Sequence, residues 1–353
     1  MSHLMQLFEA VRFPGGVEVH TDGINSATMT LDGNEYGSLR LFPLAPGVVL
    51  SFNRIYTQVW PLAQTEAANI LLLNFCLNGR CEVNLDNGQF AFLSQGIMAL
   101  GTQQAKEAYR YPSGIYEGVE LFLDLDTLAQ KPYCMFQEAG IDLSALIRHL
   151  QAAQKLYLAQ TPTATQGILS ELWELRDTED VGMMKLGSAR LLLELGRQPY
   201  VPHPRIRYFT LSQVAIAKEV CSILLSDLSH NHTAQELAER FQIGETSLKN
   251  YFRGVFGENL SVWLREARMR RAAELLRGTD LRVAEIAAQV GYENQSKFAA
   301  VFARQFGCPP LEYRRRVGSI EPCPFLPGFR KRYASAPFSR HWALSLWSST
   351  MRR

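Results

Sequence analysis

The segment LAERFQIGETSLKNYFRGVFG, from Leu237 to Gly257, shares its pattern with IAAQVGYENQSKFAAVFARQFG, from Ile286 to Gly307. Both segments begin with a branched aliphatic residue, end in Phe-Gly, and carry another phenylalanine four residues before the last one. The second segment is one residue longer, and the extra residue falls at its central turn. Each segment predicts a short helix, a tight turn and a second helix that is polar on one side.

Signals at the expected helix ends support this interpretation. Thr233 and Glu236 form a T-x-x-E capping box that starts the first helix of the first segment. Gly244 tolerates the turn and can cap the next helix, which is predicted to run to Val255. Further helices are predicted at about 212–227, 260–277, 283–290, 295–305 and 310–316. Residues 210–316 therefore predict an all-α domain with two helix-turn-helix units.

The predicted helix from Leu260 to Arg277 lies between the two repeated segments. Its 18 residues would span about 27 Å at 1.5 Å per residue. Recognition helices that enter successive major grooves on one face of DNA lie roughly 34 Å apart. The connecting helix therefore has a suitable length for a rigid spacer between two DNA-reading units.

Residues 211–316 resemble the DNA-binding domain of the AraC/XylS family of bacterial transcription regulators. The resemblance is carried by LAERF and LKNYFRGVFG in the first half and by EIAAQVGYENQSKFAAVFARQFGCPPLEYRR in the second. It implies a transcription regulator in which two helix-turn-helix units bind one asymmetric double-stranded DNA site. It also implies a small-molecule effector, a homodimer, and contact with RNA polymerase as the commoner mode of activation.

The resemblance transfers the base-reading positions of the family to five polar residues and to Ala300. Asn and Gln can bond adenine through two hydrogen bonds, Lys can bond guanine, and the short Ala300 can contact only a thymine methyl group. A solvated helix face is the alternative interpretation of the polar positions. The five expected base-contacting residues are Thr246, Lys249, Asn250, Gln295 and Ser296.

Three basic residues on the same helices are better placed for phosphates than for bases. Arg253, Lys297 and Arg304 are expected to contact the DNA backbone, which sets affinity and register without reading sequence. Ordinary surface solubility is the alternative. The arginines between 265 and 271 are interpreted mainly as surface and ion-pair residues.

The N-terminal part predicts an antiparallel β domain. Short apolar segments between residues 36 and 125 are broken by Gly, Pro, Asn and Asp, and Leu85–Gln89 has the composition of a hairpin turn. A small antiparallel barrel or sandwich follows. The family resemblance implies a cupin-like barrel that senses an effector and contributes to dimerisation. The strand segments are YGSLRLF, GVVLSF, ANILLLNFCL, CEVNL, FAFL and GVELFLDL.

Residues 126–198 are predicted to form a helical layer that packs against the sheet. Apolar residues recur three and four apart at Leu143, Leu146, Ile147, Leu150, Ala153 and Leu156, and again at Ile168, Leu169, Leu172 and Trp173. A third apolar face runs from Met184 to Leu195. One of these faces is expected to serve a homodimer. The predicted fold class is therefore α+β, with an N-terminal cupin-like barrel and a C-terminal helical domain.

Charge and proline content divide the chain. Residues 1–200 carry 13 basic and 21 acidic residues, whereas residues 210–316 carry 15 and 12. Three prolines interrupt residues 199–209, which predict a linker. The expected organisation is an effector-sensing and dimerisation domain (1–198), this linker, a DNA-binding domain (210–316) and a basic, disordered tail (317–353). An acidic sensor joined to a basic DNA binder fits this division.

Several other classes of function are not indicated. The longest apolar run is too short for a membrane span, and the six scattered cysteines are expected to be reduced thiols of a cytoplasmic protein. The sequence indicates no cofactor, no metal site and no enzyme, because no catalytic motif is present and His230 and His232 are interpreted as turn residues. A constitutive or architectural DNA-binding module without ligand response remains an alternative, as does an enzyme that uses Cys76 or Cys81.

Overall fold

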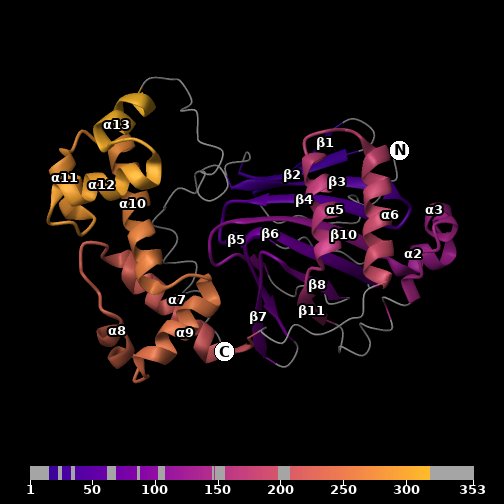
Figure 1. Cartoon of the computed structure of the whole chain (residues 1–353), viewed down its shortest axis with the longest axis horizontal. Helices are drawn as coiled ribbons and strands as arrows, with labels where there is room; N and C mark the ends of the chain where they lie inside the picture. The colour runs from indigo at the N-terminus through magenta and orange to yellow at the C-terminus, as the bar shows by residue number, and fades with distance from the viewer. Residues whose placement is uncertain are drawn as a thin grey trace. The chain divides into compact units, whose positions relative to one another are not determined.

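The computed structural model describes residues 16–22, 26–32, 36–61, 69–85, 88–101, 108–144, 147, 156–197 and 207–318. The chain divides into two compact units, Met1–Tyr208 and Phe209–Arg353 (Figure 1). Most of the predicted linker and the predicted tail beyond residue 318 lie outside the described residues. Among the helices described, none has the length and apolar composition needed to cross a membrane.

The N-terminal unit contains an antiparallel sheet with the strand order β1-β2-β3-β4-β10-β6-β7. The strand β8 pairs with β6 and with β11, and β5 pairs with β9. The predicted antiparallel sheet is thereby confirmed. Its strands are β1 (Val17–Asp22), β2 (Ser26–Leu31), β3 (Gly37–Ala45), β4 (Val48–Ile55), β5 (Val59–Trp60), β6 (Ile70–Asn84), β7 (Gln89–Ser94), β8 (Ile97–Gly101), β9 (Tyr109–Arg110), β10 (Tyr116–Asp124) and β11 (Leu156–Gln160).

Two local predictions for this unit were wrong. The segments expected as separate strands at 68–77 and 81–85 form the single 15-residue strand β6, because Gly79 adopts a φ of +82° and keeps its pairing with Tyr116. Leu156, expected on a helix, instead begins β11 and pairs with Gly101 of β8. Its apolar spacing fits a helix, but the free edge of β8 provides backbone hydrogen bonds for a strand.

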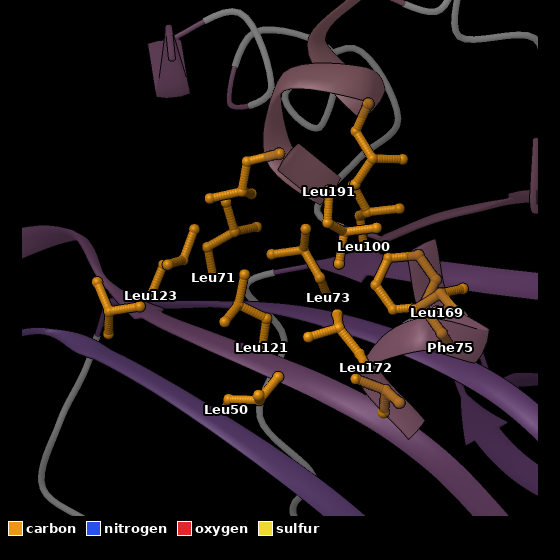
Figure 2. Close-up of a cluster of buried hydrophobic side chains, with 14 of the residues drawn as sticks. Leu50, Leu71, Leu73, Phe75, Leu100, Leu121, Leu123, Leu169, Leu172 and Leu191 are labelled. Atoms are coloured by element: carbon orange, nitrogen blue, oxygen red, sulfur yellow. The ribbon is translucent and has the colours of Figure 1, made fainter. Parts of the chain in front are cut away.

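The helical layer of this unit covers one face of the sheet. The helices α5 (Thr163–Glu174) and α6 (Val181–Arg197) lie side by side on that face (Figure 1), and α2 (Leu125–Gln130) and α3 (Cys134–Glu138) follow β10. Leucines of both helices point toward leucines of the strands (Figure 2). The predicted apolar faces at 168–173 and 184–195 are confirmed as parts of this core.

The opposite face of the sheet carries a second apolar cluster. Four aromatic residues of the N-terminal unit were interpreted from the sequence as core residues and not as pocket lining, and all four are buried. The four side chains are at most 9% exposed, and they are Phe52, Trp60, Phe75 and Phe90. The second cluster includes Trp60, Cys76, Tyr111 and Tyr116, so aromatic and sulfur-containing side chains fill this side.

The C-terminal unit is helical after the short strand β12 (Phe209–Thr210). Its α8 begins with the predicted capping box, since Thr233 accepts from the Glu236 backbone while the Glu236 side chain accepts from the Thr233 backbone. The predicted helices are confirmed, with ends shifted by one or two residues. They are α7 (Leu211–Ser226), α8 (Ala234–Arg240), α9 (Glu245–Phe256), α10 (Leu260–Gly278), α11 (Val283–Gln289), α12 (Gln295–Phe306) and α13 (Pro310–Gly318).

The packing of α6 predicts different effects for the same substitution at two positions. Leu191 is fully buried among the sheet leucines, whereas Leu186 is 56% exposed (Figure 2 labels Leu191). Leu191→Ala should lower the free energy of unfolding by about 2–5 kcal/mol, and Leu186→Ala by less than about 0.5 kcal/mol. Urea denaturation followed by circular dichroism measures both. Equal losses would contradict the described packing of α6.

Candidate nucleic-acid interface

The C-terminal unit contains the same helix pair twice. The short helices α8 and α11 have 7 residues each, and the longer helices α9 and α12 have 12 each. The turn at 241–244 joins the first pair, and the turn at 290–294 joins the second. The one-residue difference that the sequence shows therefore lies in the turn, where it changes no helix length.

Left-handed backbone positions recur at matching places in both pairs. Gln242 and Gly291 have φ values of 54° and 76° in the two turns. Gly257 and Gly307 end α9 and α12 with φ values of 85° and 73°, and the backbone N–H of Gly307 donates to Ala303 at 2.8 Å. Glycine accepts this conformation without steric cost, which explains the Phe-Gly that ends each segment.

An aromatic triad packs behind each longer helix. The ring centroids of Phe252 lie 4.6 Å from Phe256 and 5.6 Å from Trp263. In the second pair, Phe302 lies 4.3 Å from Phe306 and 5.4 Å from Tyr313. Trp263 and Tyr313 each follow the glycine cap by six residues, so the repeat continues beyond the segments recognised in the sequence.

The expected base-contacting residues of α9 lie on its solvent-facing side. Thr246, Lys249 and Asn250 are exposed, whereas Leu248 and Phe252 are buried. The ammonium group of Lys249 forms an ion pair with the carboxylate of Glu245 one turn earlier. Such an exposed pair contributes about 0.3–0.5 kcal/mol, so the lysine can exchange this partner for a base at small cost.

The second longer helix, α12, also exposes its predicted positions. Gln295 and Ser296 begin the helix, and the Asn294 side chain caps it by accepting from the backbone N–H of Lys297 at 2.9 Å. The phosphate candidates Arg253, Lys297 and Arg304 are all exposed, as is Ala300. Among the described contacts, none joins the candidate residues on α9 to those on α12. The candidates on α9 are Thr246, Lys249, Asn250 and Arg253, and those on α12 are Gln295, Ser296, Lys297 and Arg304.

Two arginines of α10 make different kinds of contact within the unit. The guanidinium of Arg268 donates to the carbonyls of Leu228 and His230, each at 2.9 Å, and Arg271 pairs with Glu274 at 2.9 Å. These contacts confirm the structural interpretation of Arg271. Arg268 differs, because it binds carbonyl groups and not a carboxylate.

A known family matches part of this unit. A model described as a helix-turn-helix domain matches residues 237–316. The chain is 37% identical over 97 residues to the HTH-type transcriptional activator RhaR of Yersinia pseudotuberculosis, which covers 28% of this chain and 33% of that protein. The C-terminal unit is of the type found in the AraC/XylS family of transcription regulators.

Two further matches cover a similar share of this chain. RhaR of an Enterobacter strain is 31% identical over 117 residues, which is 32% of this chain and 42% of that protein. A structure of a DNA-binding transcriptional dual regulator from Escherichia coli K-12 is 27% identical over 29% of this chain and 92% of that chain, with a TM-score of 0.27. The chain thus spans about a third of the length of the Yersinia relatives it matches.

The N-terminal unit holds a polar network in the sheet. Glu120 of β10 lies directly opposite Ser51 of β4 and Asn74 of β6. The Asn74 amide donates to the Glu120 carboxyl group at 2.7 Å, and the Tyr116 hydroxyl donates to Asn74. The Ser51 hydroxyl donates in turn to Asn53. Buried polar groups need such partners, because an unpaired one is costly.

Burial changes the ionisation of this network. It raises the pKa of Glu120 from 4.5 to about 7, against the lowering effect of hydrogen bonds from Asn53 and Asn74. This buried carboxyl group was not predicted from the sequence. The sequence feature that could have indicated it is the presence of Asn74 in the apolar segment ILLLNFCL and of Glu120 in GVELFLDL. Apolar residues ordinarily occupy such positions of a buried strand.

Two thiols near the network are poorly suited to nucleophilic chemistry. Cys76 and Cys81 are free and buried, and burial raises the pKa of Cys76 to about 12 and the pKa of Cys81 well above its usual value. Reactive cysteines require a lowered pKa to form a thiolate. These two residues therefore lack the property that the enzyme alternative requires.

The Glu120 carboxyl group should make the stability of the N-terminal unit depend on pH. Its folded pKa of about 7 exceeds the ordinary value of 4.5, so stability is full below that ordinary value and falls as pH rises to about 7. The loss should be roughly 3 kcal/mol, since one pKa unit corresponds to about 1.4 kcal/mol.

Glu120→Gln should remove this pH dependence. Glu117→Gln, on the same strand but partly exposed, should retain it and serves as the matched control. Urea unfolding at about pH 5 and about pH 8 measures the difference in stability. If the free energies of unfolding of Glu120→Gln and of the wild type change equally with pH, the buried carboxyl group is not the source of the pH dependence.

Proposed function

We propose that the chain is a transcription regulator in which both helix pairs are helix-turn-helix units that bind double-stranded DNA. The observation that best supports this proposal is the repeated geometry of the two helix pairs. Each pair has a left-handed turn residue, a glycine cap and an aromatic triad, and each presents polar residues to solvent on its longer helix. A longer second helix with an exposed polar face is what enters a major groove in helix-turn-helix proteins.

The connecting helix α10 supports binding of both units to one duplex. Its 19 residues correspond to about 28 Å at 1.5 Å per residue. Successive major grooves on one face of DNA are roughly 34 Å apart. Trp263 of α10 packs on the first pair, and Met269 and Leu276 of α10 belong to the core of the second. One helix therefore contributes to both cores and can serve as the spacer.

The exposed residues then take separate roles at the DNA. We assign base contacts to Thr246, Lys249 and Asn250 in one groove and to Gln295 and Ser296 in the next. Their amide, hydroxyl and ammonium groups match the donor and acceptor pattern of base edges in the major groove. The phosphate contacts are assigned to Arg253, Lys297 and Arg304, which are exposed on the same two helices.

The N-terminal residues 1–198 are proposed as a cupin-like domain that senses a small-molecule effector and dimerises. Support for sensing comes from the network of Glu120, Asn74, Tyr116 and Asn53, in which Tyr116 belongs to the second apolar cluster of the unit. Binding sites in proteins combine an apolar lining with a few such polar groups. An effector would regulate the chain by binding one conformation more tightly than another, with RNA polymerase as the downstream partner.

A constitutive or architectural DNA-binding module is the second candidate. The exposed basic side chains favour DNA binding in either case, because phosphate contacts are independent of sequence. The two candidates differ in base reading and in ligand response. Binding that is equally tight on cognate and scrambled DNA would favour the architectural module.

Base reading predicts a selective loss of affinity. Lys249→Ala or Gln295→Ala should weaken binding to the cognate site by about 1–3 kcal/mol and leave binding to random DNA nearly unchanged. The exposed Gln289 of α11 provides a matched control, and Gln289→Ala should change neither affinity. Gel-shift titrations with cognate and scrambled duplexes provide the measurement. Equal losses on both duplexes would rule out base reading at the substituted position.

Phosphate contact predicts a different pattern. Arg304→Ala should weaken binding to every sequence alike and reduce the slope of log affinity against log salt by about one unit. Arg190→Ala, an exposed arginine of α6 that pairs with Glu171 at 2.9 Å, should leave the slope unchanged. Fluorescence anisotropy over a series of salt concentrations measures the slope. An unaltered slope in the Arg304 variant would exclude the phosphate role.

A further inference from the structure

Three potential metal ligands meet where α7 is connected to α8. His230 and His232 lie in the connection, and Glu236 lies in the first turn of α8. One ligand atom from each residue lies within 4.8 Å of the others. The sequence indicated only a turn at the two histidines.

The separation of His230 and Glu236 suits a tetrahedral ion. The His230 Nε2 atom lies 3.5 Å from the Glu236 Oε1 atom. Two ligand atoms bound to zinc at about 2.1 Å each, at a tetrahedral angle, are separated by roughly 3.4 Å. The rings of His230 and His232 are also close, with centroids 4.5 Å apart. All three ligand atoms lie within 4.8 Å of one another, so they must approach by at most about 1.4 Å to bind one ion.

His232 provides a second and independent observation. Its Nε2 atom is shielded from solvent and has no hydrogen-bond partner. Leaving a buried polar atom without a partner costs about 1–3 kcal/mol, and such an atom calls for a physical explanation. A metal ion bound to the imidazole would satisfy this nitrogen, since neutral histidine is a common ligand of zinc.

The connection that carries the histidines is held in place from both sides. The Asp227 carboxylate accepts from the backbone N–H groups of Ser229 at 3.0 Å and His230 at 3.2 Å. From α10, Arg268 donates to the carbonyl oxygen of His230 at 2.9 Å. The Asp227 carboxylate also interacts electrostatically with the Arg268 guanidinium. A preorganised loop loses little conformational freedom when it binds an ion.

The same connection lies next to the turn of the second helix pair. A Cβ atom added at Gly291 would approach the Leu228 carbonyl oxygen to 2.8 Å and the Arg268 guanidinium to 2.7 Å. The residues beside the histidines therefore touch α10 and the turn between α11 and α12. An ion at the histidines would act where both halves of the C-terminal unit are in contact.

We propose that His230, His232 and Glu236 bind one divalent transition-metal ion of the zinc type. Two imidazole nitrogens and one carboxylate oxygen form a three-residue ligand set that leaves a fourth position for water. The ion ties the connection between α7 and α8 to the first turn of α8. Ion binding is separate from the proposed DNA-binding role and is measured without DNA.

The test uses the full chain after treatment with EDTA and removal of the chelator. Co²⁺ is the probe, because its visible absorption reports four-coordinate geometry, and Zn²⁺ competition follows. The wild type should bind one Co²⁺ ion per chain at this site and release it to Zn²⁺. The variant His230→Ala/His232→Ala should bind at least tenfold more weakly. Hydrogen exchange in residues 227–240 should slow when Zn²⁺ is added to the wild type only.

Two further variants make the result decisive. Glu236→Gln keeps a side-chain oxygen for the capping box and should still weaken Co²⁺ binding, so it replaces the double variant if that variant fails to fold. His20→Ala removes an exposed histidine that lies 3.4 Å from the single carboxylate of Glu18, and it should bind Co²⁺ as the wild type does. Unchanged Co²⁺ affinity in the folded ligand variants, or thiolate charge-transfer bands in place of a nitrogen and oxygen spectrum, would overturn the proposal.

Discussion

The burial of one aromatic triad behind each longer helix orients the DNA-facing side of the C-terminal unit. Phe252 and Phe302 are fully buried, and each packs on a ring that follows the glycine cap. Aromatic side chains bury a large area, about 150–250 Å² each. Rotating α9 or α12 about its axis would expose these rings and bury charged residues. The polar faces are therefore held toward solvent by the apolar ones.

The two helix pairs are coupled through a shared helix. Trp263 of α10 completes the first triad, and the later residues Met269 and Leu276 of α10 pack in the core of the second pair. Arg268 lies between Trp263 and Met269 on α10. Its guanidinium donates to two backbone carbonyl groups of the connection before α8. Because cores of this kind tolerate little deformation, the spacing of the two pairs follows from α10. The proposed metal site adds a constraint at this same junction.

The two faces of the sheet in the N-terminal unit pack different kinds of side chain. One face of its sheet packs leucines against α5 and α6, and the other face carries Glu120 with its amide and hydroxyl partners. Alternation of side chains along β10 places Val119 and Leu121 on the leucine side and Glu120 on the other. A buried carboxyl group whose pKa lies near 7 makes this second face the chemically distinctive part of the unit.

The sequence alone determined the helices of the C-terminal unit, their caps and the exposure of Thr246, Lys249 and Gln295, because helical spacing and capping depend on residues three or four apart. Only the tertiary structure decided that β6 continues through Gly79, that Leu156 joins β8, and that Glu120 meets Asn74. Strand pairing depends on partners distant in sequence, and register cannot be read from one strand. The grouping of His230 and His232 with Glu236 likewise depends on the path of a loop that α10 holds in place.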